Sequence, residues 1–292
     1  MSEVLALLGN ALISGTLIGG FYACAALGVS ITFGMLNIVN IAHPGFMLLG
    51  AFLCYYGNAR FGLDPLLTGA LLLPLFFLLG SALYLFYHRI FERHHGENIR
   101  GLAFFFGLLF IIEVGIVLTF GVDYRSVDAS YIGENLDVLG LELPLRLLVP
   151  FLAALLVLAV FYLFLSRTFI GRAILAVAQD SGALELMAVD PVKIKRIAFG
   201  LSIASAAAAG ALLIIIQTIE PSMARGFIGR LFAICVLGGL GSLPGMVIAA
   251  LTIGIAENIT STFFGPSWAP AVSFSLLLAT LLFRPSGLLG RA

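Results

Sequence analysis

Apolar stretches close to the length of a membrane span fill most of this 292-residue chain. A helix needs about 20 mostly apolar residues to cross about 30 Å of hydrocarbon. Since 61% of the residues are hydrophobic and 10% are charged, an ordinary soluble domain is excluded. We therefore predict an all-α polytopic membrane protein of about eight transmembrane helices, give or take two, in one domain over residues 1–292. The main apolar stretches are residues 4–33, 66–87, 102–120, 147–165, 197–219, 246–264 and 271–283.

Glycine, proline and asparagine interrupt the apolar pattern at residues 34–45 and again at residues 238–245. Lipid cannot satisfy the backbone of a broken helix, so such breaks occur where protein or a wet cavity supplies partners. Paired breaks in the two halves of a transporter mark a substrate route. The candidate residues of that route are Asn37, Asn40, His43, Gly239, Gly241 and Ser242.

The three polar side chains of the first break have two interpretations. A spacing of three places Asn37, Asn40 and His43 on one face if the segment is helical. They then either contact substrate directly, or they cap and brace the break.

Small residues predict close contacts between helices. Gly15 and Gly19 have the spacing of a close helix crossing in lipid, and residues 204–211 are nearly all alanine. The three cysteines lie in apolar runs at unrelated spacings, which predicts small buried side chains rather than a disulfide or a metal site. They are Cys24, Cys54 and Cys235.

The balance of basic and acidic residues predicts on which side of the membrane each central loop lies. The loop at residues 166–196 carries five basic and three acidic side chains, and a second basic loop covers residues 88–95. Net-basic loops stay in the cytoplasm. The acidic loop at residues 121–146 then belongs outside, and the C-terminus, with Arg284 and Arg291, belongs in the cytoplasm.

The basic loop at residues 166–196 contains two segments with helical spacing of apolar and small residues, 171–178 and 183–189. Asp180 or Ser181 is placed to cap the second segment. This pattern predicts a short docking helix at the inner face of the membrane. An amphipathic connector that lies on the lipid headgroups is the alternative.

Residues 171–174, 176–180 and 186–187 resemble the cytoplasmic coupling segment of the branched-chain amino acid ABC importer permeases, of the H type. Further blocks similar to this family are residues 120–127, 237–245 and 283–290, and a first block made of residues 22–23, 26–28, 33–34 and 40–43. The chain departs from the family pattern at Pro44 and Ala188, where glycine is usual, and at Gly182, where glutamate is common. The resemblance implies that the ATPase-coupling residues are Gly171, Arg172, Gln179, Asp180, Glu185, Leu186 and Met187.

The resemblance implies a permease subunit of the bacterial inner membrane that is not itself an enzyme. Its partners would be a second permease subunit, two ATP-binding subunits and an extracytoplasmic binding protein, and its cargo a branched-chain or hydrophobic amino acid or a similar small polar compound. The two lysines of the chain, Lys193 and Lys195, do not stand in a Gly-Lys-Ser/Thr motif. No cofactor is therefore expected on this chain, and ATP with magnesium belongs to partner subunits.

Glu113 and Glu257 lie deep in apolar stretches. A charge at the bilayer centre costs about 2.5–3.5 kcal/mol, so each should face the bundle and be paired or protonated. They either brace neighbouring helices or form the proton path of a self-sufficient secondary transporter, which is the rival function.

An intramembrane enzyme would need paired acids, or a histidine with an acid, on facing helices. The basic loop at residues 88–95 also contains three histidines, which we expect to be charged groups in water rather than metal ligands. They are His88, His94 and His95.

Overall fold

The computed structural model of the chain describes residues 2–92, 97–138, 141–179, 188–284 and 286–290. Helices make up most of this part. The elements in chain order are α1 (Ser2–Gly34), α2 (His43–Phe61), α3 (Pro65–Tyr87), the π-helix η1 (His88–Glu92), α4 (Glu97–Phe120), β1 (Asn135–Val138), β2 (Leu141–Pro144), α5 (Leu145–Arg167), α6 (Phe169–Val177), α8 (Pro191–Ile216), the 3₁₀ turn η2 (Pro221–Met223), α9 (Ala224–Gly238), α10 (Leu243–Phe264), the 3₁₀ turn η3 (Pro266–Trp268) and α11 (Ala269–Phe283).

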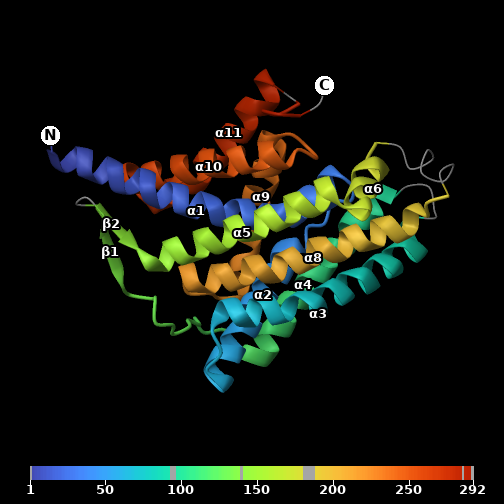
Figure 1. Cartoon of the computed structure of the whole chain (residues 1–292), viewed down its shortest axis with the longest axis horizontal. Coiled ribbons are helices and arrows are strands. Elements are labelled where there is room, and N and C mark those ends of the chain that lie inside the picture. Colours follow the sequence, from blue (N-terminus) through green and yellow to red (C-terminus); the bar gives the residue numbers. More distant parts are fainter. Residues whose placement is uncertain (1, 93–96, 139–140, 180–187, 285, 291–292) are drawn as a thin grey trace.

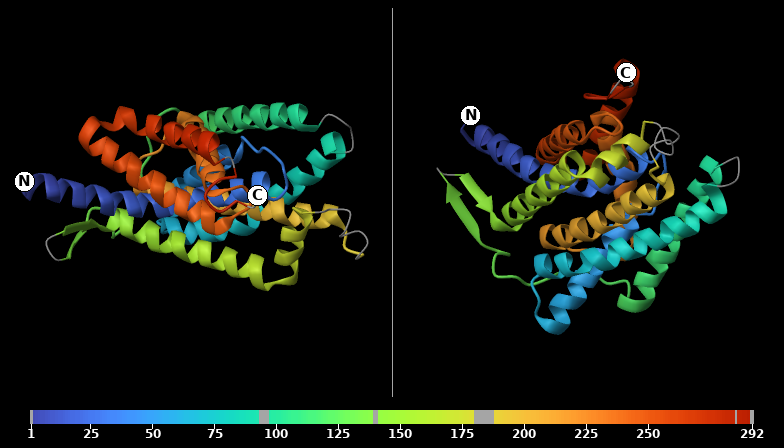
Figure 2. Two further views of the ribbon diagram at one scale, coloured as in Figure 1. Left: turned by 90° about the horizontal axis from the view of Figure 1, so that it is seen from above. Right: turned by 45° about the vertical axis from the view of Figure 1, so that its right-hand side comes forward.

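Eight helices of the described ranges are long and apolar enough to cross a membrane. This confirms the prediction of an all-α polytopic membrane protein with about eight spans. The β1–β2 hairpin lies at one end of the molecule together with the N-terminus, and α6 lies at the other (Figure 1). We refer to these as the hairpin end and the α6 end. Figure 2 shows the start of α1 projecting beyond the neighbouring helices at the hairpin end.

The most buried of the eight spans is α8. It packs against α1, α2 and α3, and small residues allow the close approach. A β-carbon on Gly50 of α2 would lie 3.0 Å from Ala207 Cα of α8. On the α8 side, a β-carbon on Gly210 would lie 2.7 Å from Ala51 N of α2. The close packing predicted for residues 204–211 is therefore confirmed.

The contact between α1 and α10 depends on glycines from both helices. A β-carbon on Gly15 would lie 2.7 Å from Ile255 Cα, and one on Gly19 would lie 2.8 Å from Leu251 Cα. Such short distances leave no room for any side chain. The predicted glycine crossing is confirmed, and its partner is α10.

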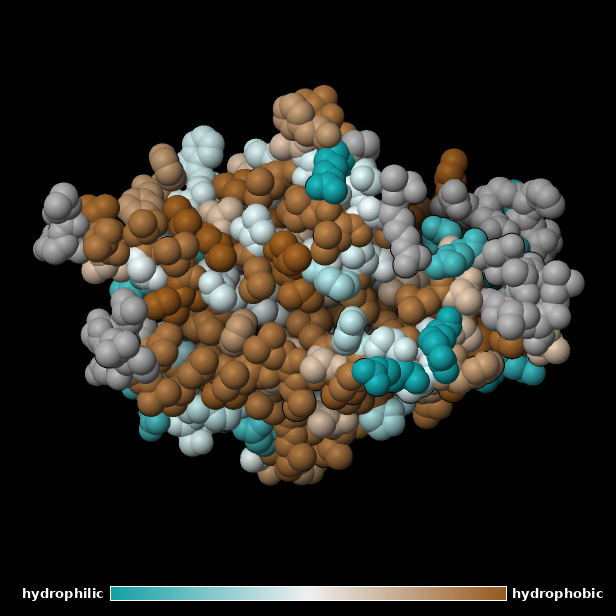
Figure 3. Space-filling model, turned by 45° about the horizontal axis from the view of Figure 1, so that its top comes forward, coloured by the Kyte–Doolittle hydropathy of each residue, from teal (hydrophilic) through white to brown (hydrophobic). Residues whose placement is uncertain are grey.

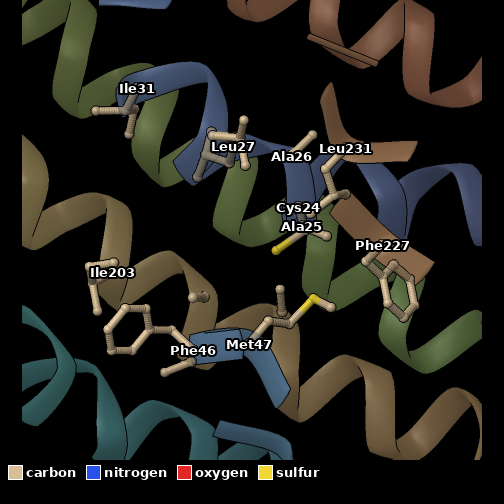
Figure 4. Packing of buried hydrophobic residues seen from close by; sticks show 14 of the residues in the cluster. Cys24, Ala25, Ala26, Leu27, Ile31, Phe46, Met47, Ile203, Phe227 and Leu231 are labelled. Atoms are coloured by element: carbon tan, nitrogen blue, oxygen red, sulfur yellow. The ribbon is translucent and has the colours of Figure 1, made fainter. Parts of the chain in front are cut away.

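Apolar side chains from α1, α2, α8 and α9 meet in the interior (Figure 4). The three cysteines are free and buried in this packing, as their apolar surroundings in the sequence predict. Outside, apolar residues cover most of the face shown in Figure 3. Leu118, Leu282 and Phe283 are each more than three-quarters exposed, which suits a surface in contact with lipid. The interior residues labelled in Figure 4 are Cys24, Ala25, Ala26, Leu27, Ile31, Phe46, Met47, Ile203, Phe227 and Leu231.

Candidate functional site

The first break lies at residues 35–42, where the chain leaves the helical conformation between α1 and α2. Asn37 has a φ of 55°, a left-handed conformation in which asparagine is found more often than most residues. Pro44 stands in the first turn of α2, where its missing N–H removes no helical hydrogen bond. The break itself is as predicted. Because it is not helical, it does not place Asn37, Asn40 and His43 on one helix face.

Asn40 and His43 are fully buried, whereas Asn37 is exposed. The Asn40 Oδ1 atom accepts a hydrogen bond from the Ala42 N–H at 3.1 Å. The His43 Nε2 atom lies 3.2 Å from the carbonyl oxygen of Ala25 in α1. Since a carbonyl oxygen only accepts, Nε2 is the nitrogen that carries the proton. Asn40 and His43 thus brace the break with one polar atom each.

The second polar atom of each of these side chains is buried without a hydrogen-bond partner in the described part of the chain. Asn40 Nδ2 is a donor, and His43 Nδ1 is an acceptor because Nε2 holds the proton. A buried polar group without a partner costs about 1–3 kcal/mol. A hydrogen-bond acceptor beside Asn40 Nδ2, or a donor beside His43 Nδ1, would each remove such a cost.

The second break is the turn between α9 and α10. Gly239 and Gly241 have φ values of 96° and 78°, which glycine adopts without the steric cost of a β-carbon. The Ser242 side chain then caps α10 by accepting a hydrogen bond from the Gly245 N–H at 3.3 Å. These glycines and the serine therefore end one helix and begin the next.

The two breaks touch each other although they are far apart in the sequence. A β-carbon on Gly34, at the end of α1, would lie 2.9 Å from Gly241 Cα. The C-terminal segment also reaches this place, because the Leu288 N–H donates to the Leu237 carbonyl oxygen at 2.8 Å. Three of the sequence blocks that carry the family resemblance thus meet at one point.

A cavity of about 400 Å³ lies beside this meeting point. Its walls come from the end of α1, the α9–α10 turn, the last turns of α5, the helix α6 and the C-terminal segment. Its described lining is mainly apolar and holds no charged side chain. The cavity brings the predicted route residues Gly241 and Ser242 together with the predicted coupling residue Gln179.

The predicted docking segment comprises residues 171–189, and helix α6 forms its first half. Its N-cap is Thr168, whose hydroxyl oxygen accepts a hydrogen bond from the Gly171 N–H at 3.0 Å. Gly171 is buried against α5, and a β-carbon there would lie 2.5 Å from Leu165 Cα. Arg172, by contrast, is exposed. The helix predicted at residues 171–178 is therefore confirmed.

The rest of the docking segment is described only at its end. Asp180, Glu185, Leu186 and Met187 lie outside the described residues, as does the body of the predicted second helix. Ala188 is described and has a φ of 57°, in the left-handed region. Glycine would occupy this conformation without strain, so alanine at this position carries a steric cost.

Glu113 and Glu257 are both paired with arginines of α9. Arg225 donates to Glu113 of α4 twice, at 3.0 and 2.6 Å. Arg230 donates to Glu257 of α10 through Nε at 2.8 Å. Glu257 also accepts hydrogen bonds from the hydroxyl of Tyr22, at 2.7 Å, and from that of Ser273. The expectation that both acids face the bundle and are paired is confirmed, since Glu113 and Glu257 are buried and each accepts from an arginine.

Sequence reasoning missed the two arginines. The sequence suggests a short outer loop that contains Arg225 and Arg230, but the structure places both in α9. Guanidinium groups lower the hydropathy of this segment, so it looks less like a span than its neighbours do. The signal that was available is the presence of two acids in apolar stretches, since an acid within a span requires a partner.

A metal site receives no support from the residues that the structure describes, which contain no group of three metal-ligating side chains. His94 and His95 fall outside them. The description of His88 as solvated charge is wrong, because its side chain is 17% exposed and its Nδ1 atom lies 2.7 Å from Glu92.

Comparison with known proteins gives consistent matches over the whole length. The family described as branched-chain amino acid transport system / permease component matches residues 11–281. The high-affinity branched-chain amino acid transport system permease protein BraD of Pseudomonas aeruginosa is 28% identical, over 96% of this chain and 95% of BraD. The corresponding LivH protein of Escherichia coli is 26% identical, over 100% of this chain and 98% of LivH. A probable LivH of Methanocaldococcus jannaschii is 27% identical, over 91% and 87%.

Eight candidate spans, with two helix breaks that meet beside a cavity, define a multi-pass membrane protein. The chain belongs to the family of branched-chain amino acid transport system permease components. The resemblance derived from the sequence blocks is thereby confirmed. A proton-coupled secondary transporter that uses Glu113 or Glu257 is not favoured, because both carboxylates are held by arginines.

Proposed function

We propose that this chain is the membrane-spanning subunit of an ATP-driven importer for branched-chain or other hydrophobic amino acids, or similar small polar compounds. The names of its relatives BraD and LivH support this class of cargo. The observation that carries the proposal is the contact between the two helix breaks beside a cavity that α6 helps to line. Movement of α6 therefore acts directly on the walls of a candidate substrate route.

The route proposed here passes the first break and reaches the cavity. An amino acid carries a carboxylate, which accepts hydrogen bonds, and an ammonium group, which donates them. Asn40 Nδ2 and His43 Nδ1 offer the complementary donor and acceptor when the break opens. The mainly apolar lining of the cavity suits an aliphatic side chain, and Ser242 and Gln179 supply polar contacts.

The partners belong to the same proposal. A second permease subunit is supported by Escherichia coli, where two proteins named as permeases of branched-chain amino acid transport, LivH and LivM, are both similar to this chain. Two ATP-binding subunits would bind ATP and magnesium and hydrolyse the ATP, so that this chain carries no cofactor of its own. An extracytoplasmic binding protein would deliver the substrate.

The proposed location is the bacterial inner membrane. The α6 end and the C-terminus face the cytoplasm in this proposal, and the acidic residues 121–146 with the β1–β2 hairpin face outwards. The excess of basic residues at positions 166–196 supports this orientation, since such loops stay inside. The docking segment then stands where a cytoplasmic ATPase can reach it.

Leucine uptake by proteoliposomes that contain the complete transporter tests the proposal. We expect uptake that requires ATP and the binding protein. Ser166→Trp fills the cavity and should abolish uptake, whereas Leu163→Trp, at an exposed α5 position outside the lining, should not. Uptake by this chain alone, driven by a pH gradient without ATP, would contradict the proposal.

A further inference from the structure

A cluster of polar side chains joins α3 and η1 to the first turns of α8. Glu92 is its centre, because one carboxylate oxygen accepts from the Tyr84 hydroxyl at 2.7 Å and lies 2.7 Å from His88 Nδ1. The other oxygen accepts from the Lys195 ammonium group. The Glu92 side chain is 16% exposed and that of Lys195 is 21% exposed. We call these four residues the Glu92 latch.

The Glu92 latch lies at the α6 end, and Lys195 stands close in sequence to the end of the docking segment. Lys195 follows Asp190 by five residues, and Asp190 is the N-cap at which α8 begins after that segment. Figure 1 shows α3 and α8 running together towards this end. Glu92 stands at the end of η1, and π-helical turns of this kind are frequent at functional sites.

The helices that the Glu92 latch joins are already held together by close packing. A β-carbon on Gly80 of α3 would lie 2.8 Å from the Ile203 side chain of α8. One on Gly200 of α8 would lie 2.9 Å from the Phe77 carbonyl oxygen of α3. A half-buried ion pair adds little net stability to such a contact, because desolvation offsets most of the attraction. Its effect is to fix the position of one charged group relative to the other.

The two lysines of the chain differ in the contacts that they make, and the difference shows which of them can connect two helices. Lys193 lies 3.6 Å from Asp190, within its own segment, and its side chain is 73% exposed. Lys195, two residues further on, reaches across to the end of η1. Only the second of these contacts connects two different helices.

We propose that the Glu92–Lys195 pair, supported by Tyr84 and His88, ties α3 to the cytoplasmic end of α8, so that movement of the docking segment shifts both helices as one body. Glu92 and Lys195 are then positioning residues that set how much transport each ATP drives. This inference rests on the proposed function, since it requires an ATPase that moves the docking segment.

The test compares ATP hydrolysis with leucine uptake in proteoliposomes that contain the complete transporter and its binding protein. The nearly isosteric Glu92→Gln, and the double variant Lys195→Met with Glu92→Gln, which leaves no buried carboxylate without a partner, should keep hydrolysis close to that of the wild type. Leucine uptake per ATP should fall by about two- to thirty-fold, the range found for changes within a coupling network. Lys195→Arg keeps the charge and should keep the ratio, and Lys193→Met is the matched control that should leave it unchanged.

The outcomes separate the two proposals. An unchanged ratio of uptake to hydrolysis in both Glu92→Gln and the double variant overturns the inference. An equal loss of hydrolysis and uptake overturns it as well, because that is the result of a purely structural role. A wild-type complex without ATP-dependent leucine uptake contradicts the proposed function itself.

Discussion

The two arginines of α9 allow a prediction in which the stability costs of two similar substitutions are compared. Arg230→Leu should destabilise the protein by about 3–5 kcal/mol, because it leaves the Glu257 carboxylate buried without its ion-pair partner. The Glu257 side chain is 5% exposed, and the hydroxyls of Tyr22 and Ser273 supply the hydrogen bonds that remain. Replacing both members of the pair by leucine should recover most of the loss, since no buried charge is then left.

The pair of Arg225 with Glu113 serves as the reference for this prediction. Arg225 has the same chemistry, but its side chain is 56% exposed, against 18% for Arg230. Glu113 is itself only 10% exposed, so Arg225→Leu also leaves an acid without its partner, but an exposed arginine contributes less to its pair than a buried one. Arg225→Leu should therefore cost less than Arg230→Leu. Both pairs consist of one arginine and one glutamate. The difference in unfolding free energy between the two variants therefore measures the effect of burying the arginine.

The assay is the free energy of unfolding of the purified chain in a mild detergent, measured for the wild type, Arg230→Leu, Glu257→Leu and the double variant. These four proteins form a double-mutant cycle, and Arg225→Leu is the control. The reasoning is refuted if Arg230→Leu costs no more than Arg225→Leu. It is also refuted if the double variant is no more stable than Arg230→Leu.

Three further outcomes are expected. Ala188→Gly should raise the free energy of unfolding by about 1 kcal/mol, because glycine relieves the left-handed strain; an unchanged thermal transition would contradict this. Gly34→Val should abolish ATP-dependent uptake by separating the two breaks, whereas Gly107→Val, where a β-carbon meets open space, should not; equal uptake by both would contradict it. Leu186→Asp and Met187→Asp should abolish uptake while the chain stays folded in the membrane, because a coupling helix transmits force through packing; normal uptake would count against the docking role.

Much of the fold follows from local sequence. Seven of the eight candidate spans in the described ranges follow from the length of the apolar stretches, because hydrocarbon thickness fixes how long a span must be. The span Pro221–Gly238 does not follow, because its two arginines lower its hydropathy. The contact of Gly15 and Gly19 with another helix follows from their spacing. The breaks follow from asparagine, proline and glycine, which favour left-handed or non-helical backbone. Each of these features depends on residues close together in the chain.

The rest of the candidate site depends on contacts between distant segments. Nothing in the two breaks shows that Gly34 and Gly241 touch, because that contact results from the packing of α1 against α9 and α10. The pairing of Arg225 with Glu113 is hidden for the same reason. His88 looks solvated in sequence because its basic neighbours suggest an open loop, whereas a π-helical turn directs it to Glu92.

The most direct test is to purify this chain from its own host in a mild detergent and to identify the proteins that come with it in stoichiometric amounts. The account predicts a second permease subunit and two ATP-binding subunits, in a complex whose ATP hydrolysis responds to the loaded binding protein. A chain that is purified alone and still moves an amino acid across a lipid bilayer would contradict it. That result would return Glu113 and Glu257 to consideration as the residues that drive transport.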